Sequence, residues 1–146
     1  MFSKEESAKL RQEFWTSFGK SFPRKWLLYN TKIKGVSFKF VADRKKALVS
    51  LDLEHPDDIA NELFYDQLLS LKTILTEEYH PEIIFDASYE LENGKIIHRM
   101  YVSHEEKFSI HTKNTWRDCY EFFINTMPKF ELFFYEYQDY IKQAIQ

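Results

Sequence analysis

Residues 35–54 read GVSFKFVADRKKALVSLDLE, and this stretch decides the fold. Apolar and polar side chains alternate on both sides of the charged residues 43–46, which is the pattern of two half-buried strands. A turn over residues 43–46 would pair Phe38 with Leu51 and place the apolar side chains of both strands on one face. The pattern predicts a β-hairpin with a well-specified register, because a slip by one residue would expose that face.

A long helix is predicted directly after this hairpin. Pro56 ends the second strand, and either Asp57 or Asp58 is placed to accept hydrogen bonds at the start of a helix. We expect the helix to continue to Tyr79 and to lie across the apolar face of the hairpin. The residues that recur at helical spacing are Ala60, Phe64, Leu68, Leu71, Leu75 and Tyr79.

A second hairpin is predicted over residues 83–101, where apolar and polar residues alternate again. Asn93 and Gly94 favour a two-residue turn, because both residues tolerate positive φ. This turn would place Tyr89 opposite His98, with both side chains on the apolar face of the sheet.

Further helices are predicted at both ends of the chain. Ser3 and Glu6 match a capping box, and the helix that follows would end near Gly19. After a possible short fifth strand at residues 107–111, we expect two helices separated by Pro128. The predicted order is α-β-β-α-β-β-(β)-α-α. This is an α+β domain in which an antiparallel sheet of two hairpins, with four or five strands, is packed on one face by helices.

The composition is that of a soluble folded protein. The chain has 146 residues, of which 44% are hydrophobic and 18% aromatic, which excludes disorder and fits a single domain over residues 1–146. No apolar run approaches the ~18 residues that would span a membrane, so we expect no membrane partner. The charged N-terminus lacks a signal-peptide core, and the one cysteine, Cys119, excludes an internal disulfide. We therefore expect a cytoplasmic protein.

Several short motifs resemble one uncharacterised family when they are taken in order. They are Phe14-Trp15 with Phe18-Gly19, Ile33-Lys34-Gly35, the run GKIIHRMY at residues 94–101, and Trp116 with Phe122-Phe123. Their order and spacing over nearly the whole chain are similar to those of domain of unknown function family 4268. Members are small prokaryotic proteins or modules attached to nuclease-like domains, so the resemblance implies a link to nucleic-acid metabolism or defence. It implies no catalytic residues.

The charge distribution points to DNA or RNA as a partner. Residues 20–46 contain nine basic side chains and one acidic side chain, whereas the whole chain has a formal net charge of −3. Aromatic residues interleave with the basic ones, and this combination suits phosphates and unpaired bases. The alternative is a solvated basic rim around aromatic core residues. The residues of the nucleic-acid hypothesis are Lys20, Arg24, Lys25, Trp26, Lys32, Lys34, Lys39, Arg44, Lys45 and Lys46.

The polar face of the predicted sheet is a second candidate site. Neighbouring carboxylates there would suit a metal-dependent hydrolase, because such acids bind Mg²⁺ or flank a scissile bond. Surface ion pairs with Lys39 and Arg99 are the alternative explanation. If the two hairpins are adjacent in one sheet, they share this face. Its candidate residues are Asp52, Glu54, Asp86, Arg99 and Tyr101.

The residue patterns favour a non-enzymatic accessory domain that contacts nucleic acid through residues 20–46. The five histidines have no metal-ligand spacing and no nucleophile elbow is present, so we expect no catalytic residue, no metal and no cofactor. The alternative function is a protein–protein interaction or homodimerisation module. Tyr135 and Tyr140 in the aromatic C-terminal helices would point away from the core and form such an interface. A metal-dependent hydrolase is the third hypothesis.

Overall fold

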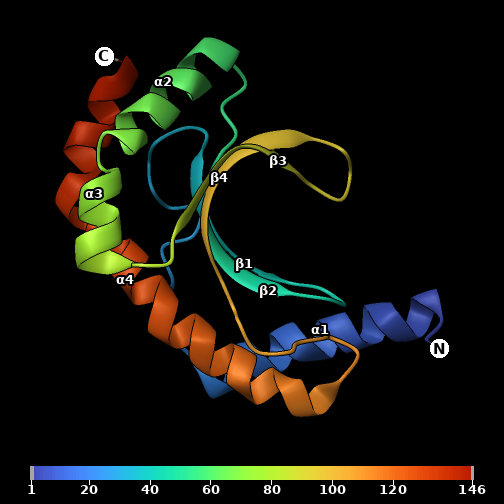
Figure 1. Ribbon diagram of the computed structural model, residues 1–146. Coiled ribbons are helices and arrows are strands. Elements are labelled where there is room, and N and C mark those ends of the chain that lie inside the picture. The colour runs from blue at the N-terminus through green and yellow to red at the C-terminus, as the bar shows by residue number, and fades with distance from the viewer. Residues whose placement is uncertain (1, 146) are drawn as a thin grey trace.

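The computed structural model describes residues 2–145 and contains one antiparallel sheet with helices packed on one side (Figure 1). The strands are β1 (Val36–Ala42), β2 (Ala47–Leu53), β3 (Ile84–Glu90) and β4 (Ile96–Ser103). The helices are α1 (Lys4–Ser21), α2 (Asp58–Leu69), α3 (Lys72–Ile74) and α4 (Trp116–Lys142). Short π- and 3-10 helices are η1 (Leu75–Tyr79), η2 (Lys113–Thr115) and η3 (Gln143–Ile145). The predicted α+β class and the two antiparallel hairpins are confirmed.

The first hairpin has the register that its alternating pattern predicts. Phe38 pairs with Leu51, and the side chains of both residues are fully buried. The backbone N–H of Asp43 donates to the carbonyl of Lys46 over 2.9 Å and closes the turn. The carboxylate of Asp43 accepts further hydrogen bonds from the backbone N–H groups of Lys45 and Lys46. The turn therefore needs no glycine, because an aspartate side chain satisfies its free donors.

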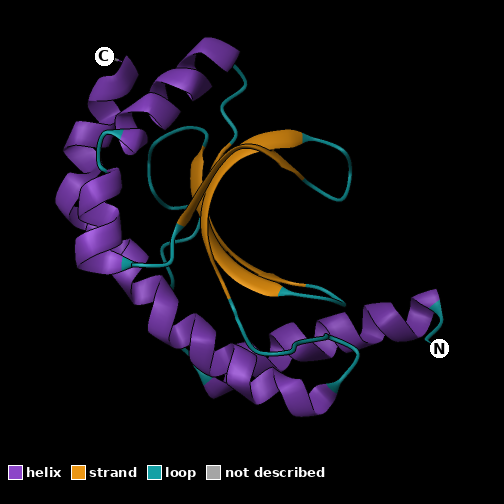
Figure 2. Ribbon diagram, in the orientation of Figure 1, coloured by secondary structure: helices purple, strands orange, loops and turns teal. Residues whose placement is uncertain are grey.

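The core lies between the sheet and α4. The sheet order is β1-β2-β4-β3, so the two hairpins meet through β2 and β4. The ring of Phe38 contacts the rings of Phe130 and Phe134 on α4, each over 5.8 Å between centroids. Figure 2 shows that the sheet is strongly curved, with α2, α3 and α4 along its outer side. We call the sheet face opposite these helices the inner face.

Helix α1 begins as its sequence predicts but extends further. The side chain of Ser3 accepts from the backbone N–H of Glu6, and Glu6 returns the contact, which confirms the capping box. The helix continues to Ser21, two residues beyond Gly19, near which its end was predicted. Phe14 and Phe18 are buried on the side of α1 that faces the hydrophobic core. The packing of these side chains stabilises the helix beyond Gly19, because a glycine inside a helix costs only about 1 kcal/mol relative to alanine.

The long helix predicted up to Tyr79 is broken into three pieces. Asp57, rather than Asp58, caps α2 by accepting from the backbone N–H groups of Ile59 and Ala60. Helix α2 ends at Leu69, and α3 and η1 follow as a separate short segment. Ser70 donates its hydroxyl to the carbonyl of Gln67 and so satisfies the end of α2. The apolar spacing continued across this break, so periodicity alone could not reveal it.

The last two predicted helices are one helix, because Pro128 does not interrupt α4. Met127 and Phe130 on either side of the proline are fully buried, so one continuous apolar face outweighs the lost hydrogen bond. The possible fifth strand at residues 107–111 is a loop instead. Its attachment is the hydrogen bond from the N–H of Ile110 to the carbonyl of Asp43, over 3.0 Å. Among residues 2–145, no helix has the length and apolar character that crossing a membrane requires.

The register predicted for the second hairpin is wrong by one residue near its turn, and by two residues beyond a β-bulge between Asp86 and Tyr89. Tyr89 pairs with Ile97 instead of His98, because the N–H of Leu91 donates to the carbonyl of Lys95 and closes a loop of three residues instead of two. The carboxylate of Asp86 accepts from the backbone N–H of Ser88 and stabilises this bulge. A bulge reverses the alternation of the residues that follow it. Tyr89 therefore lies on the inner face and not on the apolar face.

Alanine substitutions at the two glycines with positive φ test how closely the backbone at the start of the first hairpin packs against its neighbours. Gly35 (φ 81°) and Gly94 (φ 86°) both have left-handed backbones, but a Cβ on Gly35 would lie 2.6 Å from the Cα of His55. A Cβ on Gly94 would meet open space. We expect Gly94→Ala to lower the free energy of unfolding by ~1–2 kcal/mol, and Gly35→Ala to lower it by a further ~1–3 kcal/mol. Urea unfolding measures both losses, and equal losses would contradict the close contact.

Candidate functional site

The inner face of the sheet carries polar side chains that the strand register brings together. Asp52 on β2 is directly opposite Arg99 on β4. Ser50 and Tyr101 form the next pair along the same two strands and on the same face. Lys39 reaches this face from β1. The prediction that the two hairpins share one polar face if they are adjacent is therefore met by the pairing of β2 with β4.

Asp52 and Arg99 form a buried, bidentate ion pair. The Nε and Nη2 atoms of Arg99 donate to the two carboxylate oxygens of Asp52 over 2.7 and 2.8 Å. The side chains are 0% and 3% exposed. Burial by itself would lower the pKa of Arg99, but the hydrogen bonds and charge of Asp52 raise it above its ordinary value. Such a pair holds together because each charge offsets the loss of water around the other.

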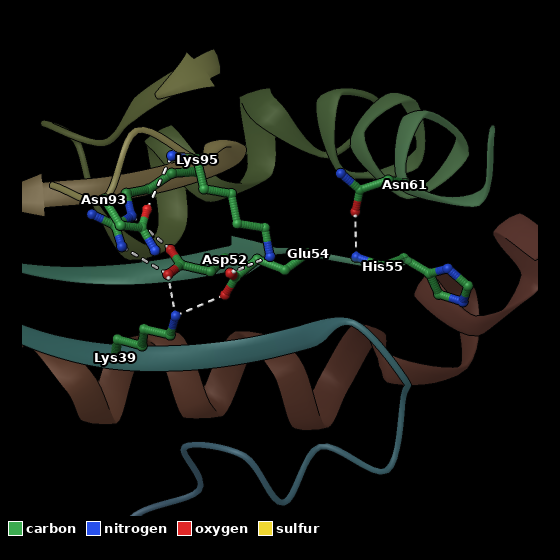
Figure 3. Close-up of polar contacts among 8 residues, drawn as sticks. Lys39, Asp52, Glu54, His55, Asn61, Asn93 and Lys95 are labelled. Atoms are coloured by element: carbon green, nitrogen blue, oxygen red, sulfur yellow. Dashed lines mark hydrogen bonds and ion pairs between the residues drawn. The ribbon is translucent and has the colours of Figure 1, made fainter. Parts of the chain in front are cut away.

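Partly exposed charged side chains continue from this pair. We call the connected side chains of Arg99, Asp52, Lys39, Glu54 and Lys95 the charge chain. Lys39 Nζ lies 3.2 Å from Asp52 and 2.7 Å from Glu54, and Lys95 Nζ lies 3.3 Å from Glu54 (Figure 3). Burial alone would raise the pKa of Glu54, but the two lysines lower it below its usual value. Burial would lower the pKa of Lys39, and the two carboxylates raise it. Lys39 and Glu54 are therefore both charged at neutral pH and stabilise each other as an ion pair.

A cleft opens on the inner face between the tips of the two hairpins, and we call it the hairpin cleft. Its volume is about 690 Å³. It is lined by five cationic and three acidic side chains together with apolar ones, and α1 contributes one of the cations. The lining residues are Arg11, Val41, Ala42, Asp43, Arg44, Lys45, Lys46, Tyr89, Glu90, Leu91, Glu92, Arg99 and Ile110.

One contact joins the two hairpins across this cleft. Lys46 Nζ donates to the Tyr89 hydroxyl over 2.8 Å, and this hydrogen bond raises the pKa of Lys46. The guanidinium of Arg99 lies 4.4 Å from the centre of the Tyr89 ring, within cation–π distance. The ring of Tyr101 meets that of Tyr89 edge-on at 5.4 Å. Tyr89 is thus held on three sides, and the hairpins keep a defined separation.

The ten residues of the nucleic-acid hypothesis do not gather at one place. Arg24 pairs with the buried Glu131 over 2.6 Å and stacks over Trp26 at 4.0 Å. Trp26 in turn packs against the partly buried ring of Phe40. Lys39 belongs to the charge chain of the inner face. Lys20, Lys25, Lys32 and Lys34 line three other, shallower surface hollows. The hairpin cleft receives the remaining three, Arg44, Lys45 and Lys46.

The polar-face residues are grouped more closely, with one exception. Asp52, Glu54 and Arg99 belong to one chain of contacts, and Tyr101 touches it through Tyr89. Asp86 pairs with Arg99 in the sheet register, but its carboxylate stabilises the bulge instead.

Two residues of the cleft were missed by sequence reasoning. Arg11 lies on α1, outside the basic run, and no local pattern marks it. Tyr89 was assigned to the apolar face, because strict alternation cannot anticipate a bulge.

The described residues contain no cluster of three or more histidine, cysteine or carboxylate side chains that could hold a metal ion. His98 is a buried histidine whose Nδ1 lies 2.6 Å from the carbonyl of Ala87, as expected for a core residue. Burial lowers the pKa of His80 to about 4. Burial also raises the pKa of the Cys119 thiol to about 12, which makes it unreactive.

Comparison with known proteins adds one finding. The sequence model of one protein family, described as a domain of unknown function (DUF4268), matches residues 10–138. This range includes the whole sheet, the charge chain and every residue of the hairpin cleft. No curated protein and no solved structure matches the chain.

The buried ion pair predicts an unequal response to two similar substitutions. Asp52→Ala leaves the cation of Arg99 buried without a partner, so we expect a loss of ~3–5 kcal/mol in the free energy of unfolding. Glu54→Ala is the matched control, because Glu54 is 21% exposed and its lysines can turn to water. We expect the control to lose no more than ~1 kcal/mol. Urea unfolding at neutral pH compares them, and similar losses would show that the pair does not hold the sheet.

Proposed function

For this chain, which belongs to the DUF4268 family as its motif order predicted, we propose a non-enzymatic role in contacting nucleic acid through the hairpin cleft. The proposed contact residues are Arg11, Arg44 and Lys45, which line this cleft together with Lys46. Lys46 itself donates to Tyr89 and bridges the two hairpins. The three contact residues replace the wider run of residues 20–46, because Arg24, Trp26 and Lys39 have structural contacts of their own.

The observation that carries this proposal is that some cations near the inner face form ion pairs and others do not. Within residues 2–145, Arg11, Arg44 and Lys45 make no ion pair, whereas Lys39, Lys95 and Arg99 all do. Cations without a protein partner at the edge of a cleft can bind phosphate oxygens and release the counterions around a nucleic acid. The paired charges instead keep the two hairpins in place.

The arrangement of the carboxylates favours binding over hydrolysis. Both oxygens of Asp52 already accept hydrogen bonds from Arg99, so they are not free to hold a metal ion. Glu54 is held between two lysines, and the carboxylate of Asp86 is directed to the backbone of Ser88. A hydrolytic metal site would need several of these oxygens to converge on one point.

The proposal predicts salt-sensitive binding that depends on the cleft. Arg44→Glu combined with Lys45→Glu should lower affinity for DNA or RNA at least tenfold at low ionic strength, because two attractive phosphate contacts become repulsive. The double variant Lys20→Glu with Lys25→Glu makes the same change of charge outside the cleft and is the matched control. Fluorescence anisotropy over a series of salt concentrations measures both. An equal loss in the control would mean that only net charge matters.

Exposed apolar side chains favour a second candidate function, a homodimer or protein–protein interface on the C-terminal helices. Leu132 and Tyr135 lie one turn apart on α4 and are 58% and 56% exposed. Tyr140 takes part in the fold instead, because its hydroxyl lies 2.6 Å from that of Ser70. The proposed interface is therefore narrower than the aromatic C-terminal region as a whole.

This second candidate predicts a dimer that a single charge disrupts. Leu132→Glu should convert a concentration-dependent dimer to a monomer, because a carboxylate would have to be buried in an apolar contact. Ile59→Glu on α2, which replaces a residue that is 74% exposed, is the control. Light scattering coupled to size exclusion gives the mass. A monomer at all accessible concentrations in the unaltered protein would remove this candidate.

A further inference from the structure

We infer that the hairpin cleft takes an unpaired, single-stranded segment of nucleic acid and excludes the duplex. This inference rests on the function proposed above and narrows it to one class of ligand. It depends on three features of the cleft: its size, the contact that closes it, and the chemistry of its two walls.

The size of the cleft suits a few nucleotides. Its volume of about 690 Å³ is within the ~300–1,000 Å³ range of pockets that take small ligands. The two walls come from separate hairpins, with residues 41–46 on one side and residues 89–92 on the other. A duplex has two backbones on opposite sides of stacked base pairs, so it could meet the outer edge of such a cleft but not its interior.

The Lys46–Tyr89 hydrogen bond sets the opening between the walls. It joins the turn of the first hairpin to β3 over 2.8 Å, so the cleft is bridged at this point. Arg99 and Tyr101 hold the tyrosine ring from the interior of the face. Because Arg99 is itself fixed by Asp52, this wall is rigid before any ligand arrives. An opening that is held in place before binding accepts a strand with little further loss of entropy.

The walls of the cleft differ in chemistry, and single strands need both kinds of surface. The first hairpin supplies Arg44 and Lys45, and α1 supplies Arg11, which suit phosphate oxygens. The opposite wall supplies the apolar Leu91 and the side of the Tyr89 ring that Arg99 does not cover, which suit the faces of unpaired bases. It also carries Glu90 and Glu92, whose carboxylates can accept hydrogen bonds from the amino groups of unpaired bases. In a duplex the base faces are already stacked on one another. The second wall therefore discriminates in favour of unpaired nucleotides, while the first wall binds any phosphate chain.

A comparison of matched oligonucleotides tests this inference. The probes are a fluorescein-labelled single strand, of a length within the ~4–16 nucleotides that comparable sites cover, and the blunt duplex of the same sequence. We expect the single strand to bind at least tenfold more tightly than the duplex at the same salt concentration. Equal or tighter binding of the duplex would overturn the inference and leave the proposed function standing. No binding of either probe at low salt would overturn both.

Two variants on the same hairpin identify the wall that discriminates. Leu91→Glu replaces the apolar side chain of this wall with a third carboxylate and should reduce binding of the single strand at least fivefold, with less effect on the duplex. Ile96→Glu places the same charge on a residue that is 61% exposed and outside the cleft lining, and should leave both affinities unchanged. Circular dichroism confirms that each variant folds. Equal effects of the two variants, or full competition by a free mononucleotide at the concentration of the strand, would overturn the inference.

Discussion

The contact between Asp52 and Arg99 is the interaction on which the sheet depends. Every residue of β2 is buried. One face of this strand is apolar and packs against the helices, and the other buried face carries the carboxylate of Asp52. Removing a carboxylate from water costs several kcal/mol unless a matched cation replaces the lost hydrogen bonds. The planar guanidinium of Arg99 donates a hydrogen bond to each carboxylate oxygen of Asp52 at the same time. Because β2 and β4 are the central strands, the same contact also joins the two hairpins.

The separation of charges follows from this arrangement. Helices cover the outer face of the sheet, and the buried pair with its neighbouring lysines covers the centre of the inner face. The sheet is strongly curved (Figure 1). The tips of both hairpins line one cleft. Charges near the centre are paired and structural, whereas Arg11, Arg44 and Lys45 at the edge of the cleft make no ion pair within residues 2–145. The cations that we propose as ligand contacts therefore lie at the edge of the sheet.

The success of sequence reasoning varied with how local each feature was. The first hairpin was predicted correctly down to its register, because its alternation is regular and its turn is satisfied by Asp43. The second hairpin was predicted as an element, but its register changed at the bulge near Asp86. The break after Leu69 was missed because the apolar spacing continues across it. The continuity through Pro128 was missed because one continuous buried face outweighs the local effect of the proline.

The sequence by itself determined the α+β class, the antiparallel pairing within each hairpin and the family of the chain, because these depend on patterns that repeat within a few residues. Only the tertiary structure decided which charges are buried and which are free. Asp52 and Arg99 are 47 positions apart, and the alternation within either strand cannot indicate that they meet. Arg11, from a third element, reaches the same cleft as Lys46 only after the sheet has folded against α1. The fate of a charge depends on the partners that folding brings to it, and those partners lie far away in the chain.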